Sequence, residues 1–128
     1  MRLAYSLRLL AWAVCSARDV PRARALLREA IEVSQELGDQ RGIAAEIDGL
    51  AAVAAAVGNS RDAARIFGAA EGLRAAIRMP ADQTERLLRR RWLALVQEAL
   101  GPEAFELAHC DGRSMTQGEG VAYALSVT

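Results

Sequence analysis

The chain has 128 residues, of which 52% are hydrophobic and only 5% aromatic, so it suits one domain with a modest, mainly aliphatic core. Sixteen basic residues balance sixteen acidic ones, which excludes a global field that would attract nucleic acid or an anionic membrane. Every basic residue is an arginine, and this excludes Schiff-base chemistry on a lysine.

Abundant alanine and scarce proline favour an all-α fold. The two cysteines, Cys15 and Cys110, lie far apart and form no CxxC motif, so the spacing typical of zinc or redox sites is absent. We therefore expect a reducing, cytoplasmic setting, with no metal and no cofactor.

The first helix is expected at the start of the chain, where apolar residues follow helical spacing at Leu3, Leu7, Leu10 and Val14. An early arginine followed by an apolar run and small residues leaves a secretory signal peptide as an alternative. Because Arg8 interrupts that run, a structural helix is favoured.

A second helix opens at Asp19, carries Pro21 in its first turn, and runs to Leu37 before Gly38. Residues 40–78 then form two helices joined by a turn at 58–60, where glycine suits a left-handed position and Asn or Ser supplies a capping oxygen. Helices joined by so short a turn lie antiparallel, and they need neighbours to cover their apolar faces.

A repeat links these segments. Ala23, Leu27 and Ala30 recur at one constant offset as small, large and small residues, at Ala63, Phe67 and Ala70. This order resembles the tetratricopeptide repeat (TPR), with a period longer than the usual one of about 34 residues. We therefore expect a TPR-like α-solenoid of about six or seven helices, with repeat units near 3–37 and 40–78.

The remainder, residues 81–126, is expected to form a C-terminal helical cap. A helix over 81–100 carries an apolar stripe and ends at Gly101-Pro102; the stripe comprises Leu88, Trp92, Leu95, Val96 and Ala99. A short sixth helix, a loop at 111–113 and a last helix opened by a capping box from Thr116 to Glu119 follow. Two i,i+4 ion pairs are also expected on the fifth helix, Asp82–Arg86 and Glu85–Arg89.

Three stretches together carry a more specific resemblance. ELGDQRGIA at 36–44, AARIFGAAEGLR at 63–74 and GPEAFELAHCDGRSMTQGEGVAYAL at 101–125 resemble the TPR-like region of large bacterial LuxR-type ATP-dependent (STAND/AAA-like) transcriptional regulators. In that family the region follows an ATPase module, and some members carry a C-terminal helix-turn-helix. The present chain has neither a P-loop nor a helix-turn-helix after residue 125, so the resemblance assigns it neither ATP hydrolysis nor DNA binding.

Most candidate sites have a structural interpretation. His109-Cys110-Asp111 contains the residue types of a catalytic triad, but adjacent side chains point in different directions and cannot converge. The run Arg89-Arg90-Arg91 could contact phosphates, although a solvated helix face is favoured. Gly68 and Gly72 form a GxxxG motif, for which a small surface for packing a neighbouring helix is the favoured interpretation.

One set of residues predicts a partner groove. In TPR arrays the first helix of each unit lines a concave side, and the repeat register places Tyr5, Arg8, Trp12, Cys15 and Asp48 there. Exposed aromatics beside arginine are typical anchors for a partner peptide. The alternative, somewhat favoured, is that upstream repeats cover this face in an intact protein. Because Arg8 and Asp48 are separated by the same offset as the repeated residues, we also expect them to approach each other on the concave side.

The predicted function is a non-enzymatic protein-interaction or signal-sensing module of a bacterial transcriptional regulator. Its expected partners are other domains of the same regulator or a peptide, with no direct contact to nucleic acid or membrane. The alternative is a stand-alone helical domain that binds nucleic acid or a small molecule. A homodimer through the N-terminal end is also expected, because the first helix exposes apolar residues.

Overall fold

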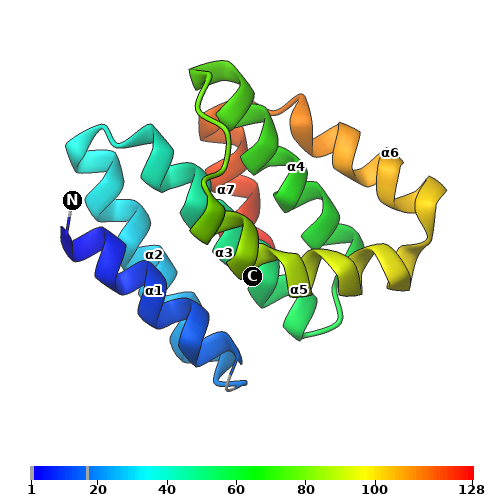
Figure 1. The fold of residues 1–128 in the computed structure, drawn as a ribbon, viewed down its shortest axis with the longest axis horizontal. Helices are drawn as coiled ribbons and strands as arrows, with labels where there is room; N and C mark the ends of the chain where they lie inside the picture. Colours follow the sequence, from blue (N-terminus) through cyan, green and yellow to red (C-terminus); the bar gives the residue numbers. More distant parts are fainter. Residues whose placement is uncertain (1, 17) are drawn as a thin grey trace.

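The computed structural model describes residues 2–16 and 18–128, and within the first helix it leaves the side chains of residues 2, 4 and 16 undescribed. The described part of the chain is all-helical, as predicted, and contains no strand. Its seven helices are α1 (Arg2–Ser16), α2 (Val20–Leu37), α3 (Gln40–Ala56), α4 (Ser60–Ile77), α5 (Gln83–Leu100), α6 (Pro102–Arg113) and α7 (Gln117–Val127). Figure 1 shows α1 to α4 as two consecutive hairpins, with the later helices packed around the second one.

The first four helices end in the same way, at regular intervals along the chain. A residue in the left-handed conformation follows each helix: Arg18, Gly38, Gly58 and Arg78, with φ between 56° and 86°. In each case the next residue donates its backbone N–H to a carbonyl five residues earlier, which satisfies a free helix-end carbonyl. Helix α4 begins and ends at the same offset from α2 as Ala63 has from Ala23.

The repeated small–large–small residues lie in the core. Ala23, Leu27, Ala30, Ala63, Phe67 and Ala70 are all buried. Alanines at these positions let neighbouring helix backbones approach, while leucine and phenylalanine fill the remaining volume. Helix α3 lies at the centre and is buried on all sides from Gly42 to Ala54, because α1, α2, α4, α5 and α7 all pack against it.

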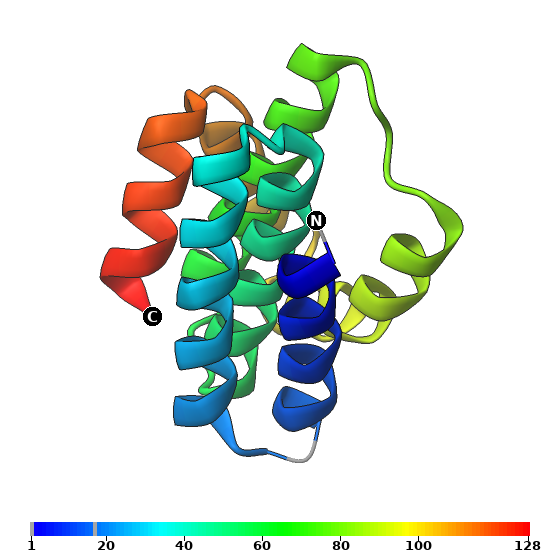
Figure 2. The same cartoon turned by 90° about the vertical axis from the view of Figure 1, so that its left-hand side faces the viewer.

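Helices α5 and α7 cover α3 and α4 from opposite sides (Figures 1 and 2). Trp92 and Val96 of the predicted α5 stripe are buried, and Leu88 packs against the core. Leu95 is 48% exposed and Ala99 is also exposed, so the stripe is narrower than predicted. The last turns of α5 extend away from α3 toward the start of α6 (Figure 1), and this leaves part of the stripe without a neighbour.

The predicted loop at 111–113 is wrong, because α6 continues as helix to Arg113. Gly112 is buried there against the backbone of α4, where an added Cβ would overlap the carbonyl oxygen of Arg65. Gly68 and Gly72 on α4 face α6 in the same way, against the carbonyl oxygens of His109 and Arg113. The favoured interpretation of the GxxxG motif is thereby confirmed. Glycine at 112 serves close helix packing and does not mark a loop.

Both ion pairs expected on the fifth helix are absent from the described residues. Asp82 instead pairs with Arg41 of α3 at 2.8 Å, and Arg89 pairs with Glu71 of α4 at 2.8 Å. Because α5 packs against α3 and α4, oppositely charged side chains on those helices come within reach of its charged residues. The capping box of Thr116 and Glu119 is present as predicted, and Asp82 and Glu85 form a second one at the start of α5.

Candidate functional site

The five residues of the predicted groove lie on α1 and α3, but α5 passes over that face. Trp12, Cys15 and Asp48 are buried, Arg8 is mostly buried, and only Tyr5 is well exposed, at 49%. The open groove expected from the repeat register is therefore wrong for most of these residues. We expected upstream repeats to cover this face. The helix that covers it is instead α5, which belongs to the same chain and follows both repeat units.

A two-chambered cavity remains between α1, α3 and α5. The outer chamber measures about 230 Å³ and opens to solvent between the three helices; it is lined by Tyr5, Arg8, Leu9, Asp39, Arg41, Gly42, Asp82, Thr84, Glu85 and Leu88. The inner chamber measures about 10 Å³, and its lining comprises Arg8, Trp12, Ala45, Asp48, Glu85 and Leu88. The two chambers share Arg8, Glu85 and Leu88, so they lie next to each other. Tyr5, Arg8, Trp12 and Asp48 are thus brought together, whereas Cys15 lines neither chamber.

Arg8 does not pair with Asp48 as predicted. Its Nη1 atom donates a hydrogen bond of 2.8 Å to Glu46 Oε2, and Ser34 of α2 donates a second, of 3.1 Å, to the same oxygen. Arg8 and Asp48 nevertheless border the same inner chamber, so the register places them on one side of the fold. Residues two apart on a helix point to nearly opposite sides, so Glu46 faces Arg8 of α1, while Asp48 faces Arg74 of α4 and Arg89 of α5.

Glu46 is fully buried, and burial raises the pKa of its carboxyl from 4.5 to about 7, against the opposing effect of Ser34 and Arg8. The reason is that the charged form loses more hydration on burial than two hydrogen bonds restore. Sequence reasoning missed this residue. The available signal was the presence of two carboxylates, Glu46 and Asp48, within the Ala- and Ile-rich run of α3, where a solvated face was not to be expected.

Asp48 is the centre of a second buried ionic cluster, which joins α3, α4 and α5. Its Oδ2 atom lies 2.8 Å from Arg74 Nη1 and 3.4 Å from Arg89 Nε. Both are ion-pair distances, and Asp48 has no hydrogen-bond partner other than these two arginines among the described residues. Burial accordingly raises the pKa of Asp48 despite the two arginines.

The acidic and basic residues of this cluster continue to the outer chamber. Glu71 lies 2.8 Å from Arg89, and Glu85 lies 3.6 Å from Arg74. Arg89 is only 11% exposed, so the interpretation of the arginine run as a solvated face is wrong for Arg89. Arg90 and Arg91 lie nearer the solvent, and the guanidinium of Arg91 lies 4.9 Å from the centre of the Trp92 ring.

The remaining chemically active side chains do not converge. His109 stacks on Phe105 with ring centres 5.2 Å apart, and burial lowers the pKa of its imidazole. Cys110 is exposed and donates to Glu106, which raises the pKa of the thiol. All three residues of the His109-Cys110-Asp111 run lie consecutively on α6, so their side chains project in different directions around the helix. Within the described residues, no group of three or more His, Cys, Asp and Glu side chains could hold a metal ion.

Comparisons with known proteins find no family model that matches the chain, and no match among curated proteins or solved structures. The resemblance to LuxR-type regulators therefore stays a prediction from the three sequence stretches. None of the helices in the described part of the chain combines the length and the apolar character needed to cross a bilayer.

Proposed function

We propose that the chain is a non-enzymatic helical module that binds a segment of another protein at the cavity between α1, α3 and α5. The observation that carries this proposal is the mouth of the cavity, where Tyr5 is half exposed beside Arg8, whose guanidinium lies 5.2 Å from the centre of the tyrosine ring. A half-exposed aromatic ring at the mouth of a concave site is a typical anchor for a partner.

The wider setting that we propose follows the sequence resemblance: a signal-sensing part of a cytoplasmic bacterial transcriptional regulator. Three helices that are distant in sequence meet at the cavity, so an occupant that prefers one arrangement of α1, α3 and α5 shifts the population toward that arrangement. An effector domain attached to this module would respond to that shift.

The test is a selection of binders from a displayed library of random peptides against the whole chain. Selected peptides should bind at least tenfold more weakly to Tyr5→Ala and unchanged to Leu107→Ala. Leu107 serves as the matched control because it is a large exposed side chain on α6, away from the cavity.

Two results would overturn the proposal. One is a set of peptides whose binding does not depend on Tyr5. The other is tight binding of duplex DNA with a steep salt dependence, which would indicate phosphate contacts and favour the alternative of a nucleic-acid-binding domain.

A further inference from the structure

The outward face of α5 carries exposed leucines that no other helix covers among the described residues. Leu87 is 54% exposed and Leu95 is 48% exposed, and both lie outside the buried part of the helix, which is formed by Trp92 and Val96. Figure 1 shows α5 running across the front of the molecule, with no other described helix in front of it. Two large apolar side chains therefore lie in water on one helix, where a second helix can cover them.

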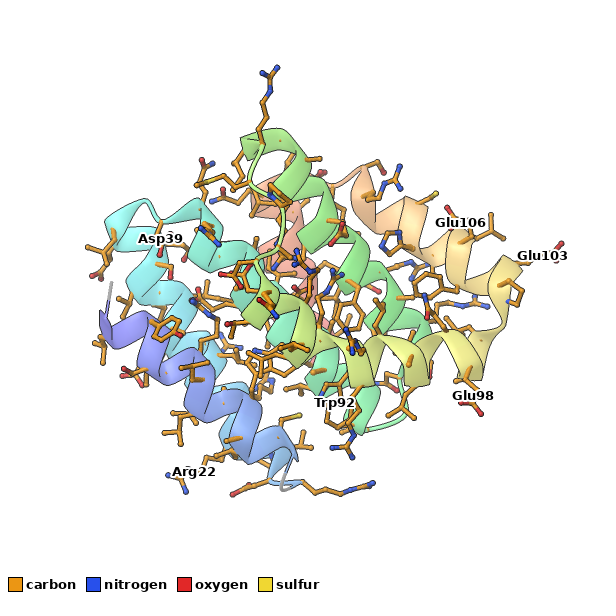
Figure 3. All side chains as sticks on the ribbon, viewed as in Figure 1. Arg22, Asp39, Trp92, Glu98, Glu103 and Glu106 are labelled. Atoms are coloured by element: carbon orange, nitrogen blue, oxygen red, sulfur yellow. The ribbon has the colours of Figure 1, made fainter. Side chains whose placement is uncertain are left out.

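Unpaired charges lie on the same face. Arg91, Ala94 and Glu98 follow Leu87 at helical spacing, and all are exposed. Glu98 projects away from the rest of the molecule (Figure 3). Neither Arg91 nor Glu98 forms an ion pair among the described residues, because the positions three and four residues away hold only leucine, alanine, glycine or proline. The two charges lie two helical turns apart, about 10 Å, a spacing that does not favour a pair within the helix.

The order of these exposed charges is the reverse of the order that a single helix prefers. Arg86, Arg90 and Arg91 are exposed in the first half of α5, whereas Glu98 lies in its last turn. The helix macrodipole favours acidic residues near the start and basic residues near the end. The stability of α5 by itself does not account for this order. A second helix that carries the same charges and runs in the opposite direction would meet it with complementary charges.

We propose that α5 pairs with α5 of a second copy of the chain, in an antiparallel arrangement around a two-fold axis. Arg91 of each copy then lies opposite Glu98 of the other copy, so one charge contact occurs twice. The axis passes near Ala94, where a small side chain lets the two helices approach, and the exposed leucines of both copies flank it. A parallel pair would place like charges opposite each other, so the charge pattern selects the antiparallel one.

The size of the contact sets its expected strength. One helix from each copy buries less than the roughly 1,200 Å² of total area that specific, stable interfaces bury, so we expect a Kd of about 1 mM. Attachment of two copies to one assembly brings their local concentration into this range. The contact is separate from the self-association expected through α1. It is also independent of the proposed function, because the cavity lies on another side of α5, where Thr84 and Leu88 line it.

Sedimentation equilibrium of the whole chain at concentrations up to about 1 mM tests the pair. All samples carry Leu10→Arg, which places a charge on the exposed side of α1 and so removes the association expected there. This parent should dimerise at an ionic strength of about 0.01 M and less at about 1 M, where the screening length is about 3 Å. Arg91→Glu and Glu98→Arg should each weaken the dimer at least tenfold, because each leaves like charges at both contacts.

A mixture of the two single variants separates charge pairing from damage to the fold. Neither variant should dimerise alone, but an equimolar mixture should associate as the parent does, because one partner face is then acidic and the other basic. Arg22→Glu on α2 makes the same charge change at another exposed arginine and should leave the dimer intact (Figure 3). A monomeric parent, a mixture that stays monomeric, or single variants that dimerise as strongly as the parent would overturn the proposal.

Disulfide trapping tests the direction of the two helices. These samples also carry Cys110→Ser, because Cys110 is exposed whereas Cys15 is buried. The thiol introduced by Ala94→Cys lies near the axis and should form a disulfide with its own copy under a mild oxidant. The thiol introduced by Gln83→Cys, at the start of α5, lies about 35 Å from its own copy in the antiparallel pair and should not. Faster trapping at position 83 than at position 94 would indicate a parallel pair and refute the arrangement.

Discussion

Gly112 on α6 lies in backbone contact with Arg65 on α4, so close that a Cβ at position 112 would overlap the Arg65 carbonyl oxygen. Gly68 makes the reciprocal approach from α4 to the backbone of α6. This contact joins the C-terminal helices to the second hairpin. It allows no side chain at either position unless the two backbones separate.

We therefore expect Gly112→Ala to lower the free energy of unfolding by about 3 kcal/mol, because overpacking at a backbone contact cannot be relieved by rotating a side chain. Gly118→Ala is the matched control on α7, since Gly118 has no atom within 4 Å of an added Cβ and alanine favours the helix by up to about 1 kcal/mol. Urea denaturation of both variants measures the difference. A Gly112→Ala variant as stable as wild type would show that the backbones of α4 and α6 separate at little cost.

At the left-handed residue after α4, we predict that a substitution raises the free energy of unfolding. Arg78 has φ of 56° at a position where the equivalent residue after α2 is Gly38. The side chain of Arg78 has no ion pair among the described residues, so Arg78→Gly should remove the cost of the left-handed conformation without losing such a contact. We expect a gain of about 1 kcal/mol by thermal or urea denaturation, reduced somewhat by the greater freedom of glycine in the unfolded chain. Arg78→Ala should show no such gain, and Gly38→Arg should lose stability by a similar amount.

The buried Glu46 predicts how stability depends on pH. Its pKa is about 7 in the folded protein and 4.5 as its ordinary value, so the folded state holds the proton more strongly than the unfolded state. The contribution of Glu46 to stability is therefore fully present below pH 4.5 and is lost as the pH rises to about 7. The groups that face it are Arg8 from α1, Ser34 from α2 and the more distant Asp39.

Comparison of wild type with Glu46→Gln isolates this effect from the other titrating groups. As the pH rises from 4.5 to above 7, the wild type should lose about 3 kcal/mol relative to the variant, the free energy that corresponds to this pKa shift. Urea denaturation at several pH values gives the difference, and Glu98→Gln should follow the wild-type curve. If the wild type instead gained stability relative to Glu46→Gln with rising pH, Arg8 would stabilise the charged form more than burial opposes it.

The exposed side of α1 predicts self-association. Leu3 is 58% exposed and Leu10 is 43% exposed, beside the half-exposed Tyr5. Such apolar surface usually finds a partner, so we expect a dimer at high micromolar concentration by light scattering. Leu10→Arg should shift the equilibrium to monomer. Leu107→Arg, on α6 at a residue that is 75% exposed, should leave the dimer intact if the contact is at α1. A monomeric wild type at these concentrations would refute the prediction.

The sequence by itself determined the helices and their repeat. Helical spacing, caps and turn residues are local features, and each needs only a few neighbouring residues to act. The offset from Ala23 to Ala63 held over the entire α2 and α4, and it extended to the left-handed positions after both helices. The capping box at Thr116 and the packing interpretation of Gly68 and Gly72 followed from the same local reasoning.

Only the tertiary structure decided which faces stay open. Whether Trp12 lies in a groove or in a core depends on α5, which is distant in sequence, and no local pattern shows where a later helix packs. The same holds for the partner of Arg8. Glu46 and Asp48 point to nearly opposite sides of α3, and the packing turns the Glu46 side toward α1, so Glu46 takes the position assigned to Asp48, which faces α4 and α5. Gly112 was assigned to a loop because a glycine in sequence looks the same whether it provides a left-handed turn or a close helix contact. The neighbouring backbone of α4 decides between the two.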